Sequence, residues 1–455
     1  MSTLDPGDDH RAVSTALRVG ATLLAAGATT DDVERAIRRV AIAGRLTDVQ
    51  VAVTMGILTM SAVGARGWPV TQVRIVGERV NDYRRLSLVA ALVDRAEDGG
   101  FAVEAIPAEI DRIDHLPPTH RPWVFVLASA VSSAAATVLF GGDAMDALAT
   151  LLIGVVVEPI VRRLERSALP EFFNALLGPF LAVGLAIVLV ALGAPIDGGL
   201  VITGSILRFL PGAAIVAGMR DLIDRSIISG SARLAEALLL GSGVAFGAGL
   251  AVRLGTALGG PTLSVGEVGL SGVGQLAQAA AAGVACATFA LRLGVERRQL
   301  LSVLLLGGGA WLVTLVTTDA ATGDLVPVIA AAVVVGVVGQ ALALRARLPS
   351  VIWTVPAVLP LLPGLTMVTG ILEVGTIEGV LTVVLAIATG FALGAGVAFG
   401  SILVTVARRA GEVTRSVVLP VIGEAGAGLA RSGERRPRRR PPEEDRDGGD
   451  GTPDG

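Results

Sequence analysis

The sequence predicts an α-helical polytopic membrane protein, with ten transmembrane helices arranged as two inverted five-helix repeats after a small cytoplasmic α+β domain. The first observation is composition, since 52% of the 455 residues are hydrophobic and only 17% are charged. Soluble proteins carry about 25% charged residues, and the mean hydropathy of +0.70 indicates that lipid surrounds much of the chain. The other two observations are a series of apolar stretches between residues 123 and 406 and a motif that occurs twice within them.

Residues 1–122 mix polar and apolar side chains and are expected to form the cytoplasmic amino-terminal domain. Apolar residues at helical spacing predict a helix over 14–26, ended by Gly27, and a second helix from Asp31, with Glu34 as its capping partner, to Gly44. Alternating apolar residues predict strands at 49–53 and 73–75, and residues 79–97 are typical of a further helix. The first apolar stretch is short and amphipathic and lacks the pattern of a signal peptide, so we expect this region to stay in the cytoplasm. A regulatory or gating role is a hypothesis.

Ten apolar stretches are long enough to cross a bilayer, which takes about 20 residues per helix. They cover residues 123–140, 144–161, 172–192, 199–219, 234–252, 273–291, 300–317, 326–344, 351–371 and 379–406. These stretches divide into a first five-helix module at 123–254 and a second at 273–406. Residues 431–455 have almost no apolar side chains to bury and are predicted to be a disordered tail.

Positive charge alternates between the linkers that join these stretches. The linkers after the second, fourth, sixth and eighth stretches contain Arg162, Arg163, Arg166, Arg220, Arg225, Arg233, Arg292, Arg297, Arg298, Arg345 and Arg347. The opposite linkers contain only Arg253, together with Asp143, Asp197, Glu267, Asp319, Asp324 and Glu373. Because arginine collects in cytoplasmic loops, the sequence predicts a multi-pass protein of the plasma membrane with both termini in the cytoplasm.

An internal repeat relates the two modules at a shift of about 152 residues. The segment Leu210-Pro211-Gly212 has a counterpart in Leu362-Pro363-Gly364, and residues 243–247 recur letter for letter at 396–400. Because five is an odd number, the second module enters the membrane in the opposite orientation, as in many secondary transporters. The glycines of the second motif are typical of close helix packing and not of a nucleotide site.

The two Pro-Gly segments are candidates for a central substrate site. Proline inside a helix removes a hydrogen bond and frees backbone groups, and such breaks are tolerated in lipid where they face protein or a cavity. We therefore expect Pro211 and Gly212 to face Pro363 and Gly364 and to offer amides and carbonyls to a substrate. The alternative is a pair of packing kinks inherited by duplication.

Three charged residues lie in or beside the helices of the first module. Arg208 precedes Pro211 and could hold a substrate carboxylate through two hydrogen bonds, or could pair with a buried acid. Glu158 could exchange protons with the cytoplasm, although an ion pair with Arg162 on the helix surface is the favoured interpretation. Asp221 is a second candidate for proton coupling, but its arginine neighbours favour a solvated loop. Asn174, Gln275 and Gln278 could contact a polar solute or join helices.

Several enzyme classes are excluded by residue counts. The single cysteine, Cys286, excludes an internal disulfide or a cysteine zinc cluster. All 37 basic residues are arginine, so a Walker phosphate loop or a Schiff-base lysine cannot occur. The histidines, His10, His115 and His120, all precede the apolar region and lack metal-pair spacing. We expect no catalytic site, no cofactor, no metal and no nucleic-acid partner.

The chain resembles the threonine/serine exporter family of bacteria and related organisms. The features that carry the resemblance are the two predicted helices from Leu17 to Gly44, the segment from Arg79 to Leu86, and the Leu-Pro-Gly break followed by Asp221. The resemblance covers roughly residues 12–406 and includes the second module, whereas the charged tail lies outside it. It implies a ten-helix plasma-membrane exporter of threonine and serine driven by the proton motive force.

The substrates and partners follow from this resemblance. The expected partners are a small amino acid, protons and the lipid bilayer, and a homo-oligomer is compatible with the sequence. Related two-subunit systems look like dicarboxylate exporters, so a succinate-like substrate is an alternative. A membrane anchor for a cytoplasmic enzyme or sensor is a second alternative, although ten helices exceed what anchoring needs.

Overall fold

The computed structural model describes residues 6–413 except 55, 65–66, 78–80, 118–119, 168, 262, 264–273, 319–324 and 374–375. The predicted disordered tail at 431–455 therefore lies outside the described residues. Contacts divide the chain into one compact unit of Met1–Val404 and another of Thr405–Gly455. The architecture below is that of the first unit.

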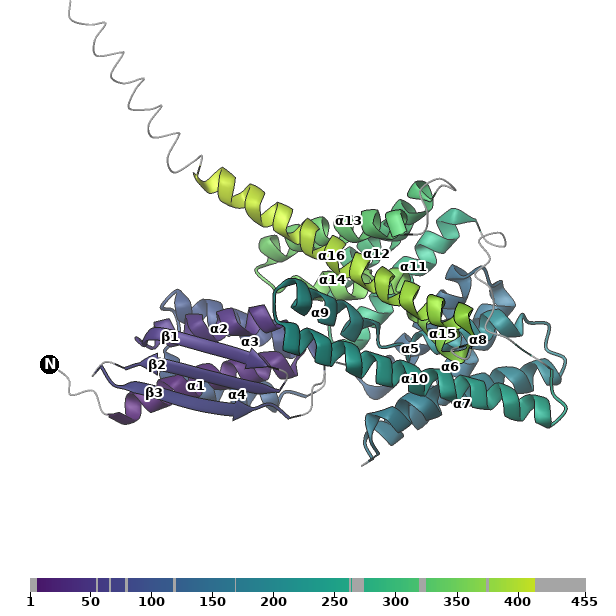
Figure 1. Ribbon diagram of the computed structural model, residues 1–455, viewed down its shortest axis with the longest axis horizontal. Helices are drawn as coiled ribbons and strands as arrows, with labels where there is room; N and C mark the ends of the chain where they lie inside the picture. Colours follow the sequence, from purple (N-terminus) through teal and green to yellow (C-terminus); the bar gives the residue numbers. More distant parts are fainter. Residues whose placement is uncertain are drawn as a thin grey trace, which may run out of the picture. The chain divides into compact units, whose positions relative to one another are not determined.

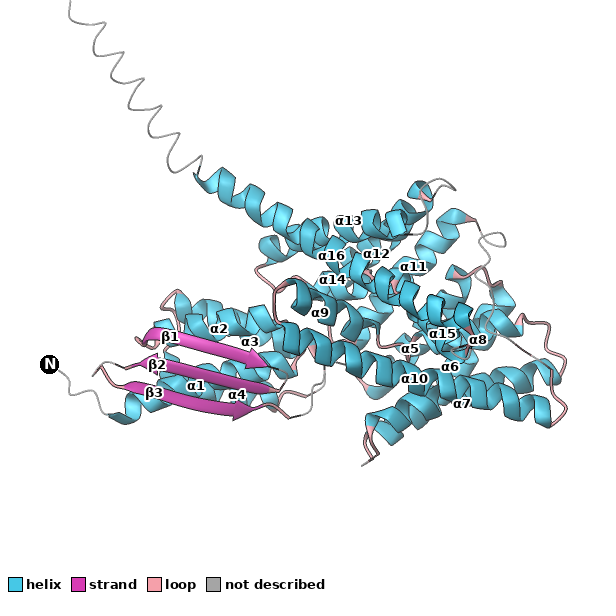
Figure 2. Ribbon diagram, viewed as in Figure 1, coloured by secondary structure: helices cyan, strands magenta, loops and turns pink. Residues whose placement is uncertain are grey.

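The amino-terminal domain is a three-stranded antiparallel sheet with helices on one face (Figures 1 and 2). The strands follow one another in the order β1, β2, β3, and the helices α1 and α2 pack against them. The central strand alternates, since Leu58, Met60 and Ala62 are buried while the residues between them are partly exposed. The elements are α1 (Pro6–Ala25), α2 (Thr30–Ala43), β1 (Thr47–Thr54), β2 (Ile57–Val63), β3 (Pro69–Ile75), α3 (Tyr83–Glu97), η1 (Val103–Ala105) and α4 (Ile106–Asp114).

Several local predictions for this domain need correction. The helix α2 is capped by Thr29, whose side chain accepts a hydrogen bond from the Asp32 amide, so capping by Asp31 with Glu34 is wrong. Four residues in succession can cap a helix here, and the fold uses the first of them. The first helix begins eight residues earlier than predicted, at Pro6, and α3 begins at Tyr83 after its cap Asp82. The strand β2 and the helix α4 were not predicted.

The described residues of the apolar region form helices joined by short turns and no strand, and most helix boundaries agree with the predicted stretches to within a few residues. The elements of the first module are α5 (Pro122–Leu139), α6 (Ala144–Glu165), α7 (Glu171–Ala191), α8 (Gly198–Leu207), α9 (Gly212–Ile223) and α10 (Ile227–Ala257). Those that follow are α11 (Gln275–Arg292), α12 (Arg297–Thr317), α13 (Leu325–Ala346), α14 (Val351–Ala357), η2 (Leu359–Leu361), α15 (Gly364–Leu372) and α16 (Ile377–Val413).

Seven of the described helices are long and apolar enough to cross a membrane, or eight if the bent pair of α14 with η2 and α15 counts as one span. The protein is thus a multi-pass membrane protein. The predicted count of ten also includes α11 and the pair α8 and α9. Of these, α11 carries two glutamines and an arginine, which lower its hydropathy, and α8 is only 10 residues long because the chain breaks at Pro211.

The repeated glycine motif packs helices closely in both modules, as predicted. A Cβ atom at Gly247 of α10 would overlap the carbonyl of Leu176 in α7, and one at Gly400 of α16 would overlap the carbonyl of Val333 in α13. One turn earlier, a Cβ atom at Gly243 or at Gly396 would lie 3.1 Å from a carbonyl oxygen of the same facing helix. Only glycine allows backbones to approach this closely.

Candidate functional site

Both Leu-Pro-Gly segments interrupt helices where the sequence predicts. Pro211 is the N-cap residue of α9 and Pro363 is the N-cap residue of α15. A proline fits this position because it has no amide to donate within a helix interior. In the second module the chain bends by 41° between α14 and the segment that leads into α15.

The two breaks contact each other through their leucines and glycines. A Cβ atom at Gly212 would overlap the side chain of Leu362, and one at Gly364 would overlap the side chain of Leu210. The contact is reciprocal, because each glycine meets the leucine that stands two residues before the other glycine. Reciprocal contacts of this kind are typical of an interface around a two-fold axis.

Arg208 forms an ion pair with Glu158 in the interior of the first module. Arg208 ends α8, Glu158 lies in α6, and the two side chains are 5% and 2% exposed. The guanidinium carbon also lies 4.3 Å from the centre of the Phe209 ring. The guanidinium atoms Nε and Nη2 have no hydrogen-bond partner among the described residues. One edge of the cation is therefore left for an anion, because these two nitrogens can bind a carboxylate side by side.

The predicted ion pair between Glu158 and Arg162 is present, but it does not lie on the helix surface, because the Glu158 side chain is only 2% exposed. The Nε atom of Arg162 lies 4.0 Å from the nearer Glu158 oxygen, whereas the Glu158 side chain faces Arg208 in the protein interior. Arg162 also places its guanidinium carbon 4.6 Å from the centre of the Phe125 ring. Of the two interpretations of Arg208, the structure agrees with pairing to a buried acid, which is Glu158.

Two small cavities meet at Arg208. The larger, of about 20 Å³, lies between the modules and is lined by Arg208, Ser133, Gly212, Leu210 and Leu362, among others. The smaller, of about 10 Å³, lies inside the first module and is lined by Arg208, Ser133 and Ser205 with apolar neighbours. Each has room for about one water molecule. The structure thus brings the predicted Arg208 and Gly212 together at the breaks.

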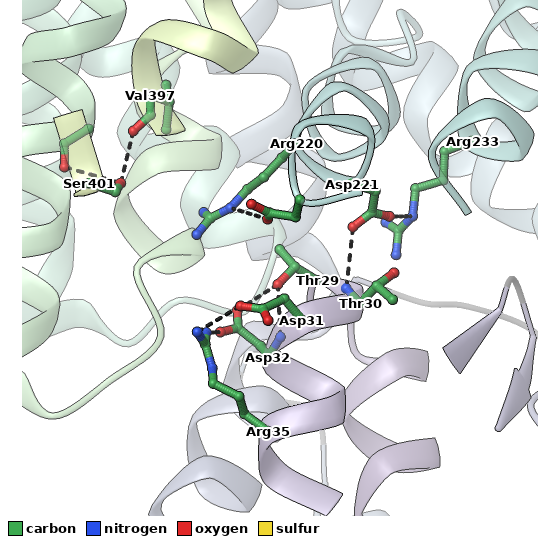
Figure 3. Close-up of polar contacts among 12 residues, drawn as sticks. Thr29, Thr30, Asp31, Asp32, Arg35, Arg220, Asp221, Arg233, Val397 and Ser401 are labelled. Carbon is green, nitrogen blue, oxygen red and sulfur yellow. Dashed lines mark hydrogen bonds and ion pairs between the residues drawn. The ribbon is translucent and has the colours of Figure 1, made fainter. Parts of the chain in front are cut away.

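Asp221 joins the end of α9 to the amino-terminal domain (Figure 3). Its carboxylate accepts a hydrogen bond from the backbone amide of Thr30 at 3.3 Å and lies 3.0 Å from the Nε atom of Arg233. Arg233 also donates to the carbonyl oxygen of Ala28 at 3.4 Å. The Asp221 side chain is 1% exposed, so the predicted solvated loop is wrong at this residue. Burial raises the pKa of Asp221, and Arg233 opposes that shift.

A second contact joins the same domain to the other module. The amide of Tyr83, at the start of α3, donates to the carbonyl oxygen of Leu293 at the end of α11, with a length of 2.8 Å. The amide of the preceding residue, Asp82, donates to the carbonyl oxygen of Ala26. Ala26 is close in sequence to Thr30, whose amide binds Asp221. One edge of the amino-terminal domain therefore contacts both modules on the side that carries the arginine-rich linkers.

Sequence reasoning missed several residues of these sites. The sequence predicts that Arg233 lies in a cytoplasmic linker, whereas it lies inside α10. The helical spacing of Arg233 from Ser229 and Gly230 is the signal that could have indicated its burial. The available signal for the buried residues Ser129, Ser133 and Ser205 is the presence of hydroxyl groups in otherwise apolar helices. Gln278 is fully buried and its amide has no partner among the described residues, so helix joining by this side chain finds no support.

The comparisons with known proteins decide the family. Residues 14–255 match the family model described as a threonine/serine exporter, and residues 278–407 match a second model described as Threonine/Serine exporter, ThrE. The chain belongs to the threonine/serine exporter family. A protein of Mycobacterium tuberculosis named "Probable threonine/serine exporter" is 28% identical over 414 residues, which cover 88% of this chain and 78% of that protein.

A threonine/serine exporter of Corynebacterium glutamicum is also 28% identical, over 417 residues that cover 88% of this exporter chain and 85% of the relative. No solved structure matches the chain. The family confirms the resemblance seen in the sequence and identifies a transporter and not an enzyme. The dicarboxylate alternative is not favoured by these relatives.

The buried ion pair of Asp221 and Arg233 predicts an effect on the stability of the protein. Removing one partner of a buried ion pair leaves the other charge unpaired and costs roughly 3 kcal/mol or more. We expect Asp221→Asn and Arg233→Gln each to lower the thermal unfolding midpoint of the purified protein, and the double variant to lose less than the sum of the two. Asp224→Asn is the matched control, because Asp224 is more exposed and lies 3.8 Å from Arg220. Additive losses in the double variant would contradict the pairing.

Proposed function

We propose that this protein exports threonine and serine across the plasma membrane by alternating access between two five-helix halves, coupled to the proton motive force. The observation that carries the proposal is the reciprocal contact between Gly212 and Leu362 and between Gly364 and Leu210. It supports a pseudo-two-fold axis through the two breaks. In transporters with inverted repeats the substrate binds at such an axis.

Helix packing around the breaks supports the same axis. The helix α9 of the first half packs on α16 of the second, where Met219 meets Gly394, and α15 packs on α10, where Met367 and Ile371 meet Gly241. Gly241 and Gly394 occupy matching positions in the two copies of the glycine motif. The broken helix of each half therefore packs against a long helix of the other half. Movement of one half against the other would displace both broken helices together.

The ion pair of Arg208 and Glu158 supports a mechanism for a zwitterion. We assign the substrate carboxylate to the free edge of Arg208 and the substrate ammonium to the Glu158 carboxylate. The Glu158 carboxylate then binds either a proton or the substrate ammonium. This competition couples the entry of protons to the export of the amino acid. A proton that enters from outside releases the amino acid, and loss of that proton to the cytoplasm prepares the site for the next one.

The size of the cavities agrees with a cycle of opening and closing. The space beside Arg208 holds about one water molecule, whereas threonine has eight non-hydrogen atoms. The two halves must therefore separate at the breaks before substrate enters. The contacts of the amino-terminal domain with both halves, through Asp221 and through Leu293, make it a candidate to control that separation.

The proposed substrate and energy source predict one efflux pattern. Cells that express the protein and are loaded with labelled threonine, serine and succinate should release threonine and serine, and a protonophore should abolish that release. Cells with an empty vector provide the baseline. Release of succinate alone would move the protein to the dicarboxylate alternative, and release that survives the protonophore would reject proton coupling.

The role of Arg208 predicts a difference between two variants. Arg208→Gln should lower threonine export at least about tenfold, since a charge-assisted hydrogen bond contributes roughly 1.5–3 kcal/mol. The double variant Arg208→Gln with Glu158→Gln removes both charges, so it should recover any lost membrane abundance but not export. Recovery of export in the double variant would leave Arg208 as a structural partner of Glu158.

The role of Glu158 predicts a change in coupling. Glu158→Gln keeps the shape of the side chain but cannot bind and release a proton. We expect export by this variant to respond no longer to an imposed pH gradient while it still responds to the threonine gradient. The matched control is Glu165→Gln, since Glu165 is half-exposed at the end of the same helix. An unchanged response to the pH gradient in Glu158→Gln would remove this residue from the proton path.

A further inference from the structure

Three buried serines of α5 and α8 lack a hydrogen-bond partner among the described residues. Ser129 and Ser133 lie one turn apart on α5 and Ser205 lies on α8, with exposed fractions of 2%, 2% and 3%. None of the three hydroxyl oxygens has a partner among the described residues. A serine in an apolar helix normally donates to the carbonyl one turn earlier, as Thr137 does to Ser133 at 3.2 Å. A buried hydroxyl without a partner costs about 1–3 kcal/mol, so these positions need a reason.

Two of the serines lie together beside the arginine. Ser133 and Arg208 line both cavities, and Ser205 lines the smaller one with them. The helices are close here because α8 has Gly204, where a Cβ atom would lie 3.0 Å from the Ser133 carbonyl oxygen and would overlap the Thr137 hydroxyl. The glycine thus places Ser205 next to Ser133. Arg208 follows Ser205 by three residues and so lies on the same side of the helix end.

The remaining walls complete a pocket with three kinds of chemistry. Thr150 also lines the smaller cavity, but its hydroxyl already donates to the Asp146 carbonyl and accepts from Thr137. Ile153 and Val157 present apolar side chains to the same cavity. The pocket therefore offers a cation for a carboxylate, two free hydroxyls for a polar group, and an apolar wall for a methyl group. Threonine carries the carboxylate on Cα and both the hydroxyl and the methyl group on the adjacent Cβ, and serine lacks only the methyl group.

We propose that Ser133 and Ser205 form the subsite for the side-chain hydroxyl of the exported amino acid. This inference rests on the proposed export of threonine and serine and adds the residues that distinguish them from apolar amino acids. When threonine binds, its hydroxyl gives the two serines the partner that they lack in the closed state. When valine binds, a methyl group takes the place of that hydroxyl and the serines stay unpaired. A site built to bond a substrate hydroxyl discriminates strongly against the analogue without it.

The test measures selectivity. The full-length protein is reconstituted in liposomes loaded with labelled threonine and labelled valine, and the efflux rates of both are measured on the same preparation. The parental protein should export threonine far faster than valine. In Ser133→Ala and in Ser205→Ala the ratio of threonine to valine efflux should fall roughly tenfold, because each loses one hydrogen bond to the hydroxyl. The ratio does not depend on how much protein folds.

Ser242→Ala is the matched control, because its hydroxyl lies in a membrane helix but donates to the carbonyl of Leu239 in its own helix at 2.7 Å. Its ratio should equal the parental one. If Ser133→Ala and Ser205→Ala both keep the parental ratio, or if threonine and valine efflux fall together, the hydroxyl subsite is rejected. If the parental protein releases no threonine at all, the proposed function itself fails, and that result is distinct from an unchanged ratio.

Discussion

The absence of water from the bilayer interior is the constraint on which this architecture depends. Each backbone group and each charge inside the apolar region must find its partner within the protein. Helices satisfy their own backbone, so the described apolar region is helical, and the few interruptions lie against each other at Gly212 and Gly364. An arginine in this medium costs several kcal/mol unless it is paired. Arg208 meets that demand with Glu158, and the pair fixes the position of α8 against α6.

The same constraint separates the residues that hold the fold from those that are free to bind. Thr137 and Thr150 satisfy each other and the carbonyls of their own helices, so they join α5 to α6. Ser133 and Ser205 have no such partner, and neither do two nitrogens of Arg208. A protein that leaves donors unpaired in an apolar interior loses stability there, and such losses are usually found at functional sites. Free polar groups therefore mark the site more clearly than the volume of the cavity does.

Much of the fold was predictable because its signals are local. Hydropathy placed the helices to within a few residues, and proline placed both breaks, since it cannot continue a helix. Partners that are distant in sequence were not predictable. Arg162 lies one turn from Glu158 and pairs with it at 4.0 Å, but the closer partner, Arg208, is 50 residues away and approaches only when α8 packs against α6. Asp221 looked solvated because the burial of its carboxylate depends on an entire second domain.

The two halves share their packing but not their chemistry, which argues for one substrate site and not two. The helices α5 and α6 align with α11 and α12 at a shift of 153 residues, which pairs Ser133 with Cys286 and Glu158 with Trp311. At the shift of 152 that aligns the two Leu-Pro-Gly segments, Ser205 pairs with Ala357 and Arg208 with Pro360. In the second half the sulfur of Cys286 lies 3.9 Å from the carbonyl of Ala357. The counterparts of the two serines are thus also neighbours, yet they offer no charge and no free hydroxyl. Under the proposed alternating access, symmetry of the backbone would allow the halves to move as equivalent bodies, and asymmetry of the side chains would place recognition in the first half alone. In the proposed cycle, only the ion pair of Arg208 and Glu158 would have to be broken and re-formed.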